Sequence, residues 1–386
     1  MRILHTADWH IGRTFHGHPT LDTLREVLGA IPGVVEEHKV DVVVVAGDIF
    51  DSSTPSGDAF TLLQDALLAI HNAGAQIILV SGNHDSAARL GFAGPFAGFA
   101  GVHIVTDPLT IGTPVTLTDE HGEIDFYCIP FLEPALIRHR FSDETLRNQA
   151  DALRFAMGPV HEAVASRSAA RAVVVGHTFV VGGESESSES ERPITVGTVD
   201  AVPLDTFDGI AYVALGHIHG AAKLSERVRY SGALMHYSFG EAGKPRGGWL
   251  IDLGADGVSD EQWIDLPVPR PLQSIEGELE QVLVAPEYDK YREYWVRVVL
   301  TDSTRPMDAM RRLQRRFPWC THVEHRPATV TSDGATSYAE RVQNKTDTEI
   351  LDAFLTHVRN GEAPTDVETE LLHGVIEAHR IEAARR

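Results

Sequence analysis

The sequence predicts an α/β fold built around parallel strands. Residues 40–51, VDVVVVAGDIFD, contain four consecutive valines without polar alternation, which is typical of a strand covered on both faces. Strand-like segments at 2–6 and 76–81 accompany it, and helical patterns at 20–38 and 56–73 separate the three strands. This βαβαβ order favours parallel strands joined by right-handed crossovers.

The two helical patterns each show an apolar stripe. In residues 20–38 the stripe is interrupted by Pro32 and Gly33, so we expect a break or kink there. In residues 56–73 the apolar residues lie three or four apart, and we expect this stripe to face the sheet. Its members are Phe60, Leu63, Leu67 and Ile70.

After residue 101 the pattern changes to short strands, which we expect to pair antiparallel. Ser142 is the expected cap of a long helix that reaches about Arg167. Residues 182–192, GGESESSESER, predict a mobile, solvated loop whose function the sequence does not indicate. Three later segments predict a second sheet of short strands: 229–231, 248–253 and 262–266.

Three domains are expected. Residues 1–266 form the large α/β domain, and the proline-rich segment PVPRP at 267–271 is the linker candidate. Residues 267–330 read as a small α+β module, with helices at 276–283 and 306–317 and strands at 294–301 and 321–325. Residues 331–386 begin with a polar stretch and end in two helices, 347–360 and 365–385. Their narrow apolar stripes suit either docking on a partner or folding back on the same domain.

Composition limits the functional classes. The chain has 386 residues and a formal net charge of −22, which argues against strong intrinsic duplex binding, although bound divalent cations or a partner protein would reverse the local field. Cys128 and Cys320 form no CxxC pair, so a disulfide framework is not expected. No run is long enough to span a membrane and no leader is visible, so we expect a cytoplasmic protein.

Metal-capable side chains follow five apolar strands. The strands at 2–6, 40–46 and 76–81 lead into Asp, His and Asn residues, and those at 173–176 and 212–216 lead into histidines. Because ligands of open α/β sheets bind at the carboxyl ends of the strands, we expect these side chains to converge. They are Asp8, His10, Asp48, Asn83, His177, His217 and His219.

These side chains would suffice for two divalent metal ions if Asp48 bridges them. Two cations about 3.5 to 4 Å apart clamp the attacking and leaving oxygens of phosphoryl transfer. Oxygen and nitrogen ligands without thiolate suit Mn²⁺, Fe or Zn²⁺, of which we favour Mn²⁺. His84 could donate to a phosphate oxygen or protonate the leaving hydroxyl, with Asp85 orienting its ring. Each histidine alone reads as an ordinary polar side chain, and only the set favours a metal site.

Five sequence blocks resemble the calcineurin-like metallophosphoesterase superfamily: DxH at 8–10, GDxxD at 47–51, GNHD at 82–85, GH at 176–177 and GHxH at 216–219. Within it, HTADWHIGR at 5–13, FDSSTPS at 50–56, RPITVGTVDAVP at 192–203 and ALGHIHG at 214–220 resemble the SbcD family of nuclease subunits. The resemblance is strong over residues 1–265 and extends beyond them by layout alone. It implies a four-layer α/β/β/α sandwich with a small capping domain and C-terminal helices.

The resemblance also implies residue roles and partners. One metal ion would be held by Asp8, His10, Asp48 and His219, and the other by Asp48, Asn83, His177 and His217, with His84 stabilising the transition state. Residues 267–330 would be a DNA-capping domain, and residues 331–386 would dock on the coiled coil of an SbcC-type ATPase. The expected assembly contains a homodimer of this chain within a heterotetramer, but no stretch identifies the dimer surface.

Three functions remain open at this stage. The first is an Mn²⁺-dependent nuclease of DNA repair and recombination, cutting duplex ends, hairpins and single strands with ATP coupling on duplexes. The alternative is a metallophosphodiesterase that hydrolyses a small nucleotide, and the third is a docking subunit with an idle site. In the small module, Arg311, Arg312, Arg315 and Arg316 are either a phosphate-contacting patch or a solvated helix face. Cleavage polarity and the native metal cannot be predicted.

Overall fold

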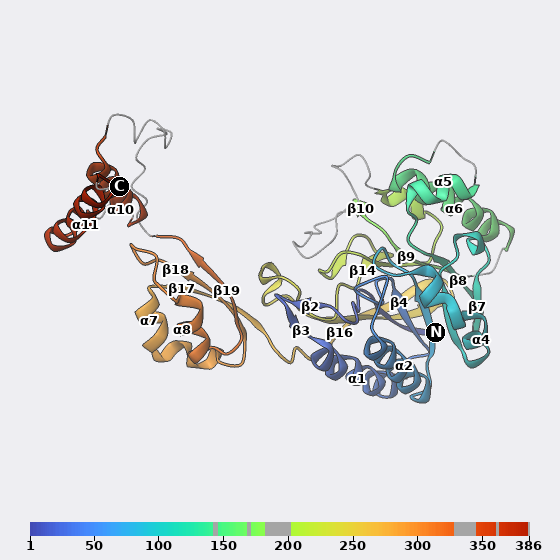
Figure 1. Cartoon of the computed structure of the whole chain (residues 1–386). Coiled ribbons are helices and arrows are strands. Elements are labelled where there is room, and N and C mark those ends of the chain that lie inside the picture. The colour runs from blue at the N-terminus through green and yellow to red at the C-terminus, as the bar shows by residue number, and fades with distance from the viewer. Residues whose placement is uncertain (142–145, 168–170, 182–201, 328–344, 360–362, 385–386) are drawn as a thin grey trace. The chain divides into compact units, whose positions relative to one another are not determined.

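The computed structural model describes residues 1–141, 146–167, 171–181, 202–327, 345–359 and 363–384. It divides into two compact units, Met1–Pro271 and Leu272–Arg386, which are described separately (Figure 1). The acidic segment 182–192 and the expected cap Ser142 lie outside the described residues, as does most of the polar stretch after 330.

The first sheet of unit 1 has six strands in the order β16-β15-β1-β4-β5-β6. Four of them are parallel, and the β15–β16 hairpin adds antiparallel to β1. Every residue of β4 is buried, in agreement with the valine pattern. The bounds are β1 (Arg2–Thr6), β4 (Val42–Ala46), β5 (Gln76–Val80), β6 (Val102–Val105), β15 (Gly247–Gly254) and β16 (Gly257–Asp265).

The second sheet has the order β13-β14-β12-β9-β8-β7. Its four central strands β14, β12, β9 and β8 are parallel, while β13 and β7 pair antiparallel at the edges. The bounds are β7 (Val115–Asp119), β8 (Gly122–Ile129), β9 (Arg171–His177), β12 (Tyr212–Gly216), β13 (Ala222–Lys223) and β14 (Val228–Tyr230).

Two strand predictions were wrong in detail. Val102–Val105 pairs parallel with β5 rather than antiparallel, and the segments after residue 227 do not form a sheet of their own. Instead β14 joins the second sheet, and β15 and β16 extend the first. Strand partners depend on long-range packing, which a local pattern does not contain.

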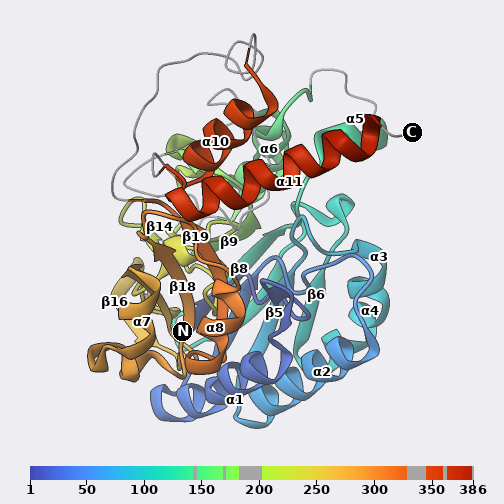
Figure 2. The same cartoon turned by 60° about the vertical axis from the view of Figure 1, so that its left-hand side comes forward.

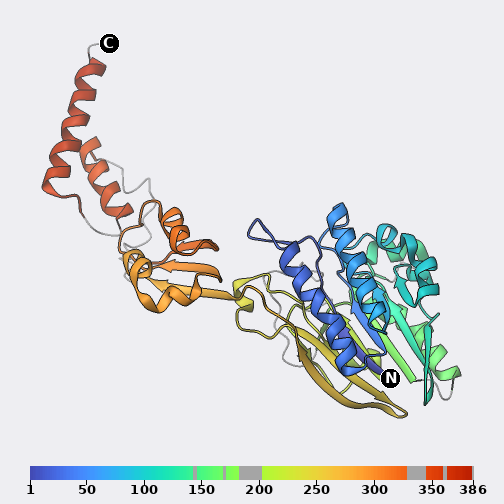
Figure 3. The same cartoon turned by 90° about the horizontal axis from the view of Figure 1, so that it is seen from below.

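The two sheets face each other across a shared apolar cluster. Val44 and Ala46 of the first sheet belong to the same cluster as Val175 and Ala214 of the second. Helices α1 (Leu21–His38) and α2 (Gly57–Asn72) cover the other face of the first sheet, and α6 (Gln149–Ser166) covers the other face of the second (Figures 1 and 3). The predicted four-layer α/β/β/α arrangement is therefore confirmed.

Helix α1 runs through Pro32 without the expected break. Its buried stripe continues from Ile31 to Val35, so apolar burial on both sides of the proline outweighs one lost backbone hydrogen bond. Helix α2 begins after Ser56, whose hydroxyl accepts from the backbone N–H of Ala59. Phe60 is exposed rather than facing the sheet.

The long helix expected from residue 142 is instead a pair of helices. They are α5 (Pro134–Phe141) and α6, which is capped by the Asn148 side chain accepting from the N–H of Asp151. The remaining short elements of unit 1 are α3 (Ala87–Leu90), α4 (Gly94–Ala97), β2 (Thr14–Phe15), β3 (His18–Pro19), β10 (Val180–Val181) and β11 (Val202–Pro203).

Unit 2 begins with a three-stranded parallel sheet in the order β17-β18-β19. Helices α7 and α8 pack on one face of this sheet, where Leu279, Leu313 and Phe317 meet Val296 and Val298 (Figure 2). The predicted helix at 276–283 was wrong at its start, because residues up to Gly277 form β17. The bounds are β17 (Leu272–Gly277), α7 (Leu279–Val284), β18 (Trp295–Leu300), α8 (Ala309–Arg316) and β19 (Cys320–His325).

The chain ends in two paired helices, α10 (Asp347–Val358) and α11 (Asp366–Ala384). An ion pair between Arg359 and Glu368 joins them at 2.8 Å, and His373 lies 3.1 Å from Asp352. Among the described helices of the chain, none is both long enough and apolar enough to cross a bilayer.

Candidate metal centre

Three loops at the carboxyl ends of β1, β4 and β5 carry the first group of predicted ligands. Asp8 and His10 follow β1, Asp48 follows β4, and Asn83 follows β5. Backbone hydrogen bonds join these loops, since the N–H of Asp8 donates to the carbonyl of Gly47 at 3.0 Å and that of His10 donates to the carbonyl of Asp48 at 2.9 Å. The parallel strand order therefore brings these residues to one sheet edge.

The second sheet supplies the histidines. His177 is the last residue of β9, and His217 and His219 follow β12. Nδ1 of His177 donates to the carbonyl of Ala46 at 3.0 Å, and the backbone N–H of His217 lies 3.1 Å from both carboxylate oxygens of Asp8. These contacts tie the two sheet edges together at the predicted site.

Asp48 lies at the centre of this group. Its Oδ2 atom is 3.7 Å from Nε2 of His10, 3.8 Å from Nε2 of His84 and 3.5 Å from Nε2 of His177. Its Oδ1 atom accepts a hydrogen bond from the backbone N–H of His84 at 2.9 Å. One carboxylate thus contacts imidazoles from both sheets, a position suited to bridging two cations.

Potential metal-binding atoms gather in three overlapping sets, in each of which every pair lies within 4.8 Å. Asp8, His10 and His219 form one set, and Asp8, Asp48 and His177 form another; His84 completes the third with His10 and Asp48. The predicted ligands outside these sets lie beside them. Oδ1 of Asn83 is 2.9 Å from Nε2 of His177, and the His217 ring centroid is 5.3 Å from that of His177.

Acceptor atoms face one another around His177, and this arrangement fits a cation. Because Nδ1 of the ring donates to a carbonyl, Nε2 carries the lone pair of the neutral form. Burial lowers the pKa of His177 to about 4, so the ring is neutral at pH 7. Its Nε2 nevertheless faces Oδ1 of Asn83 and Oδ2 of Asp48. These acceptors repel one another unless a positive charge lies between them.

The other histidines are neutral for the same reason. Burial is the main cause that lowers the pKa of His10 and of His217 well below the usual histidine value, and it also lowers the pKa of His219. Neutral imidazole is the form that binds metals. In the described part of the chain, Nδ1 of His10 is buried without a hydrogen-bond partner. The donor set of carboxylate, amide and imidazole without thiolate fits transition-metal dications.

The backbone is strained at the site. Asp8, His10 and Asp48 have φ angles of 52°, 46° and 49°, and His217 has a φ of 105°. Left-handed φ values are uncommon for residues with a Cβ, and they concentrate at functional sites held in place by the surrounding structure. Four of the seven predicted ligands therefore adopt conformations that local preference does not explain.

Two glycines allow the loops to approach this closely. A Cβ at Gly47, which has a φ of +90°, would lie 2.2 Å from Nδ1 of His177, and one at Gly82 would lie 2.1 Å from Oδ1 of Asp48. Real Cβ atoms do not approach other atoms so closely, so both positions require glycine. The GD and GN pairs of the sequence thus have a steric cause.

The side chains of His84 and Asp85 have different hydrogen-bond partners. The His84 ring reaches the site through Nε2, and its Nδ1 donates to the carbonyl of Asp51 at 2.8 Å. The expectation that Asp85 orients this ring was wrong. Asp85 instead accepts backbone N–H bonds from Ile49, Phe50 and Gly82 at 2.8 to 3.0 Å, which fixes the loops after β4 and β5. Burial, together with the charge of Asp48, raises the pKa of Asp85 to about 7.

A buried pair behind His219 was not predicted. Glu241 lies 3.8 Å from Nδ1 of His219, and Arg246 donates both to Glu241 at 2.6 Å and to the His219 carbonyl at 2.5 Å. Carboxylates behind a ligating histidine fix its ring orientation and increase its basicity. The sequence around Glu241, SFGEAGK, has no motif that indicates this role.

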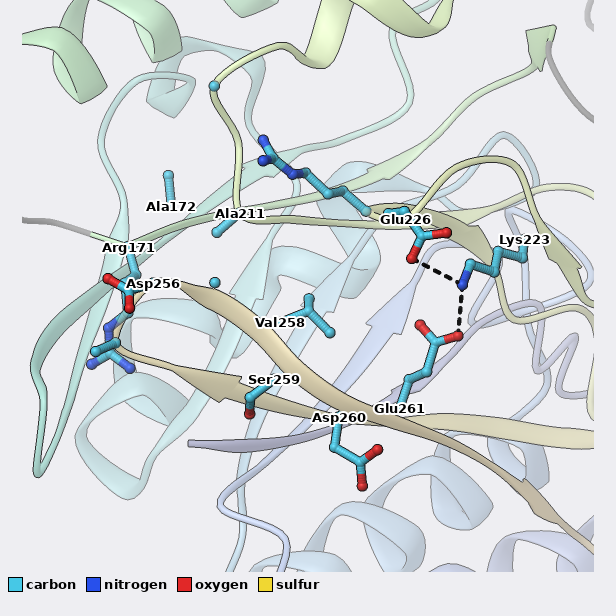
Figure 4. A pocket seen from close by; sticks show the side chains of 14 residues that line it. Arg171, Ala172, Ala211, Lys223, Glu226, Asp256, Val258, Ser259, Asp260 and Glu261 are labelled. Atoms are coloured by element: carbon cyan, nitrogen blue, oxygen red, sulfur yellow. Dashed lines mark hydrogen bonds and ion pairs between the residues drawn. The ribbon is translucent and has the colours of Figure 1, made fainter.

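A separate cavity of about 620 Å³ lies near the amino ends of β9 and β12, the strand ends opposite to the histidines (Figure 4). Its lining includes Lys223, which pairs with Glu226 at 3.3 Å and with Glu261 at 2.9 Å. Two acidic side chains of the cavity thus compensate the charge of Lys223, and none of the candidate metal ligands lines the cavity.

Comparison with known families identifies both parts of the chain. Residues 1–221 match the calcineurin-like phosphoesterase family. Residues 268–359 match the SbcD_C family, described as the type 5 capsule protein repressor C-terminal domain.

Three solved structures are similar to this chain over 68% to 85% of its length. The protein TT1561 of Thermus thermophilus has 12% identity and a TM-score of 0.41, covering 68% of this chain and 98% of that one. A dimetal phosphatase from Danio rerio has 12% identity and a TM-score of 0.40, covering 69% and 99%. GAP50, the anchor in the inner membrane complex of Plasmodium, has 11% identity and a TM-score of 0.41, covering 85% and 98%.

Proposed function

Because this chain belongs to the calcineurin-like phosphoesterase family and carries an SbcD-type C-terminal domain, we propose that it is the Mn²⁺-dependent DNA nuclease subunit of an SbcCD-type complex. It hydrolyses phosphodiester bonds at duplex ends, hairpins and single strands, and an SbcC-type ATPase couples its action on duplexes to ATP. It acts in DNA repair, recombination and replication, and it is located in the cytoplasm.

The observation that carries this proposal is the position of Asp48. A carboxylate oxygen within 3.8 Å of three imidazoles, with a facing Asn83 oxygen, supports two cations sharing Asp48. Asp8, His10, Asp48 and His219 would hold one, and Asp48, Asn83, His177 and His217 the other. Two such cations lower the pKa of a bound water and neutralise charge on the phosphate oxygens. The mixed oxygen and nitrogen donors favour Mn²⁺, Fe or Zn²⁺ over Mg²⁺.

His84 is the proposed catalytic residue of the chain itself. The Asp51 carbonyl accepts from Nδ1, which fixes the ring so that Nε2 points toward Asp48. From there Nε2 reaches a phosphate oxygen or the departing hydroxyl. Because Nδ1 already carries a hydrogen, Nε2 donates a proton only from the imidazolium form of the ring, which returns to the neutral form. Asp85 contributes by holding the loops that carry Asp48 and His84, through its three backbone hydrogen bonds.

The second unit supports the proposed partners. Residues 267–330 form the DNA-capping module, and residues 331–386 dock on the SbcC coiled coil. On α11 the apolar residues Val367, Leu371 and Val375 are four apart and exposed, so they form a stripe that does not pack on α10. Such a stripe suits a helix that lies in a partner's groove.

Exposed phenylalanines in unit 1 support the proposed homodimer. Phe92, Phe96 and Phe99 lie in the short helical turns between β5 and β6, and each is at least 78% exposed. An apolar patch of this kind is unusual on a monomer. We expect a Phe92→Ser/Phe96→Ser variant to shift the mass measured by light scattering from dimer to monomer, while Leu68→Ser on α2 leaves it unchanged.

Cleavage assays test the proposed function. The chain is incubated with Mn²⁺ and linear duplex DNA, alone and with the SbcC-type ATPase and ATP, and in parallel with a small phosphodiester. The proposal expects DNA cleavage that the ATPase increases on duplex substrates. Rapid hydrolysis of the small ester without DNA cleavage under any condition would instead favour a small-nucleotide phosphodiesterase.

A further inference from the structure

A second cavity, of about 510 Å³, lies in unit 2 between α7 and α8. We call it the arginine pocket, because four of its seven lining residues are arginines. The lining consists of Leu283, Val284, Asp289, Arg292, Arg312, Arg315 and Arg316. It is formed by residues of one unit alone.

Arg316 builds the wall of this pocket. Its side chain is only 8% exposed, and it donates to the carbonyls of Val282 at 2.9 Å and Ala285 at 2.6 Å, at the end of α7. A cation there satisfies the last carbonyls of the helix and complements its dipole. Its Nε atom is buried and finds no hydrogen-bond partner among the described residues. Burying a guanidinium with an unused donor is costly unless a ligand accepts from it.

The other three arginines differ in whether their N–H groups already have hydrogen-bond or ion-pair partners. Arg292 donates to Asp289 through Nε and Nη2, at 3.1 and 2.8 Å. Arg312 pairs with Glu280. Arg315 lines the pocket and is exposed, and within the described parts of the chain it makes neither a hydrogen bond nor an ion pair. It is therefore a cation available to a ligand.

Asp289 is the carboxylate of the lining, and its charge is compensated. Arg292 and Arg316 both donate to its Oδ1 atom, and these side-chain hydrogen bonds lower the pKa of Asp289. It stays ionised at neutral pH and holds Arg292 at the pocket. Two carboxylates, those of Asp289 and Glu280, pair with arginines of the pocket. Because the pocket has four arginines, it keeps an excess of positive charge.

This excess is unusual within the chain. The whole sequence carries a formal charge of −22, whereas residues 272–326 contain equal numbers of acidic and basic residues. Helix α8 contributes Arg311, Arg312, Arg315 and Arg316, and its Leu313 anchors the opposite side in the core. An anion that binds in this module therefore meets less repulsion than the charge of the whole chain would suggest.

We propose that the arginine pocket binds a phosphodiester group of the DNA substrate. The inference rests on the proposed nuclease function and adds to it residues, other than the candidate metal ligands, that contact the DNA strand. Guanidinium groups offer paired N–H donors that match two phosphate oxygens, and Arg315 and Arg292 present such donors at the rim. Val284 lines the same pocket and is exposed, so it offers an apolar contact for a sugar.

Binding of a fluorescent duplex to the full chain, without added divalent cation and over a range of salt concentrations, tests the pocket. The variants are Arg315→Gln and Arg292→Gln. The control is Arg311→Gln, which removes the same charge from α8, the helix that carries Arg315. Arg311 pairs with Asp308 at 2.5 Å and does not line the pocket. Each pocket variant should weaken binding about three- to tenfold and reduce the salt slope of log K by about 1.

The possible results separate the explanations. Pocket variants with the affinity and salt slope of the Arg311→Gln control would overturn the proposal. So would pocket variants that lose binding of inorganic phosphate, followed by ³¹P NMR, but bind DNA normally, since the pocket would then hold a small free phosphate. A wild-type chain that binds no DNA, alone or with its ATPase partner, would overturn the proposed function itself. Mn²⁺-dependent hydrolysis of a small phosphodiester should be equal in all variants.

Discussion

Nδ1 of His84 lies 2.8 Å from the carbonyl oxygen of Asp51, and this contact directs Nε2 of the ring toward Asp48. The backbone of one loop thereby sets the orientation of the proposed catalytic residue of the next. Since Nδ1 is engaged with a carbonyl, Nε2 is the atom left to exchange a proton with substrate.

His84→Ala should keep both cations and lose hydrolysis. The ring is proposed to act on substrate rather than as a metal ligand, so metal content measured by mass spectrometry should not change, whereas kcat should fall about 10²- to 10⁴-fold. His71→Ala on the exposed side of α2 is the control. An unchanged kcat in His84→Ala would show that the assignment is wrong.

Asp48→Asn should lose metal binding. Asparagine tolerates the left-handed backbone at this position, and its amide oxygen can still accept from the His84 N–H, so the variant removes mainly the negative charge. We expect fewer than two cations per chain by calorimetric titration with Mn²⁺. Asp58→Asn, exposed in the first turn of α2, removes an equal charge and should bind like the wild type. Two cations bound with unchanged affinity in Asp48→Asn would contradict the bridging role.

The sequence predicted this convergence for a physical reason. Parallel strands end at a common edge, so Asp8, Asp48 and Asn83 needed only the βαβαβ order to be placed together. The pairing of β9 with β12 aligned His177 beside Gly216 in the same way. Periodicity and strand order therefore contained most of the information about the site.

The supporting contacts were not predictable. Glu241 ends a short 3₁₀ turn, and Arg246 precedes β15, so both reach His219 from outside the strands that carry the ligands. The His84 ring is held by the backbone carbonyl of Asp51, which any residue type would provide. Asp85 was given the wrong partner because adjacency in sequence to His84 does not determine which way a loop side chain points. The predictions that Phe60 faces the sheet and that a helix begins at residue 276 were wrong for a similar reason. In both cases packing decided between local alternatives of similar energy.

Gly82→Ala should damage the site through steric overlap alone. Its backbone has an ordinary φ, yet the added Cβ would fall 2.1 Å from Oδ1 of Asp48 and 2.3 Å from its backbone nitrogen. We expect a loss of about 1 to 3 kcal/mol in the free energy of unfolding together with loss of Mn²⁺ binding. Thermal melting and metal titration would measure both.

Gly29→Ala is the matched substitution for this test. Gly29 lies inside α1, and an added Cβ would meet nothing within 4 Å. Alanine there should stabilise the protein by about 0.5 to 1 kcal/mol and leave metal binding unchanged. If both glycine variants behaved alike, close packing around Asp48 would not explain the requirement for glycine at 82.

His5 should make the protein less stable in mild acid. Its ring is fully buried between the Tyr212 hydroxyl, 2.8 Å from Nδ1, and the Leu215 carbonyl, 3.2 Å from Nε2. Burial lowers the pKa of His5 to about 3, against 6.5 in the unfolded chain. The unfolded state therefore binds the proton first, and the free energy of unfolding falls as the pH drops below 6.5. The loss reaches on the order of 3 kcal/mol by pH 4.

The pH dependence of a His5→Gln variant isolates this contribution from that of the metal-site histidines. Glutamine can still donate to the Leu215 carbonyl, but it does not titrate, and the Tyr212 hydroxyl loses its acceptor. The variant should thus be less stable than the wild type at pH 7.5 and should lose less stability between pH 6.5 and pH 4 in urea unfolding. His71→Gln should follow the wild-type curve. Parallel curves for His5→Gln and the wild type would mean that the His5 ring becomes protonated without unfolding, for example by a local opening of β1.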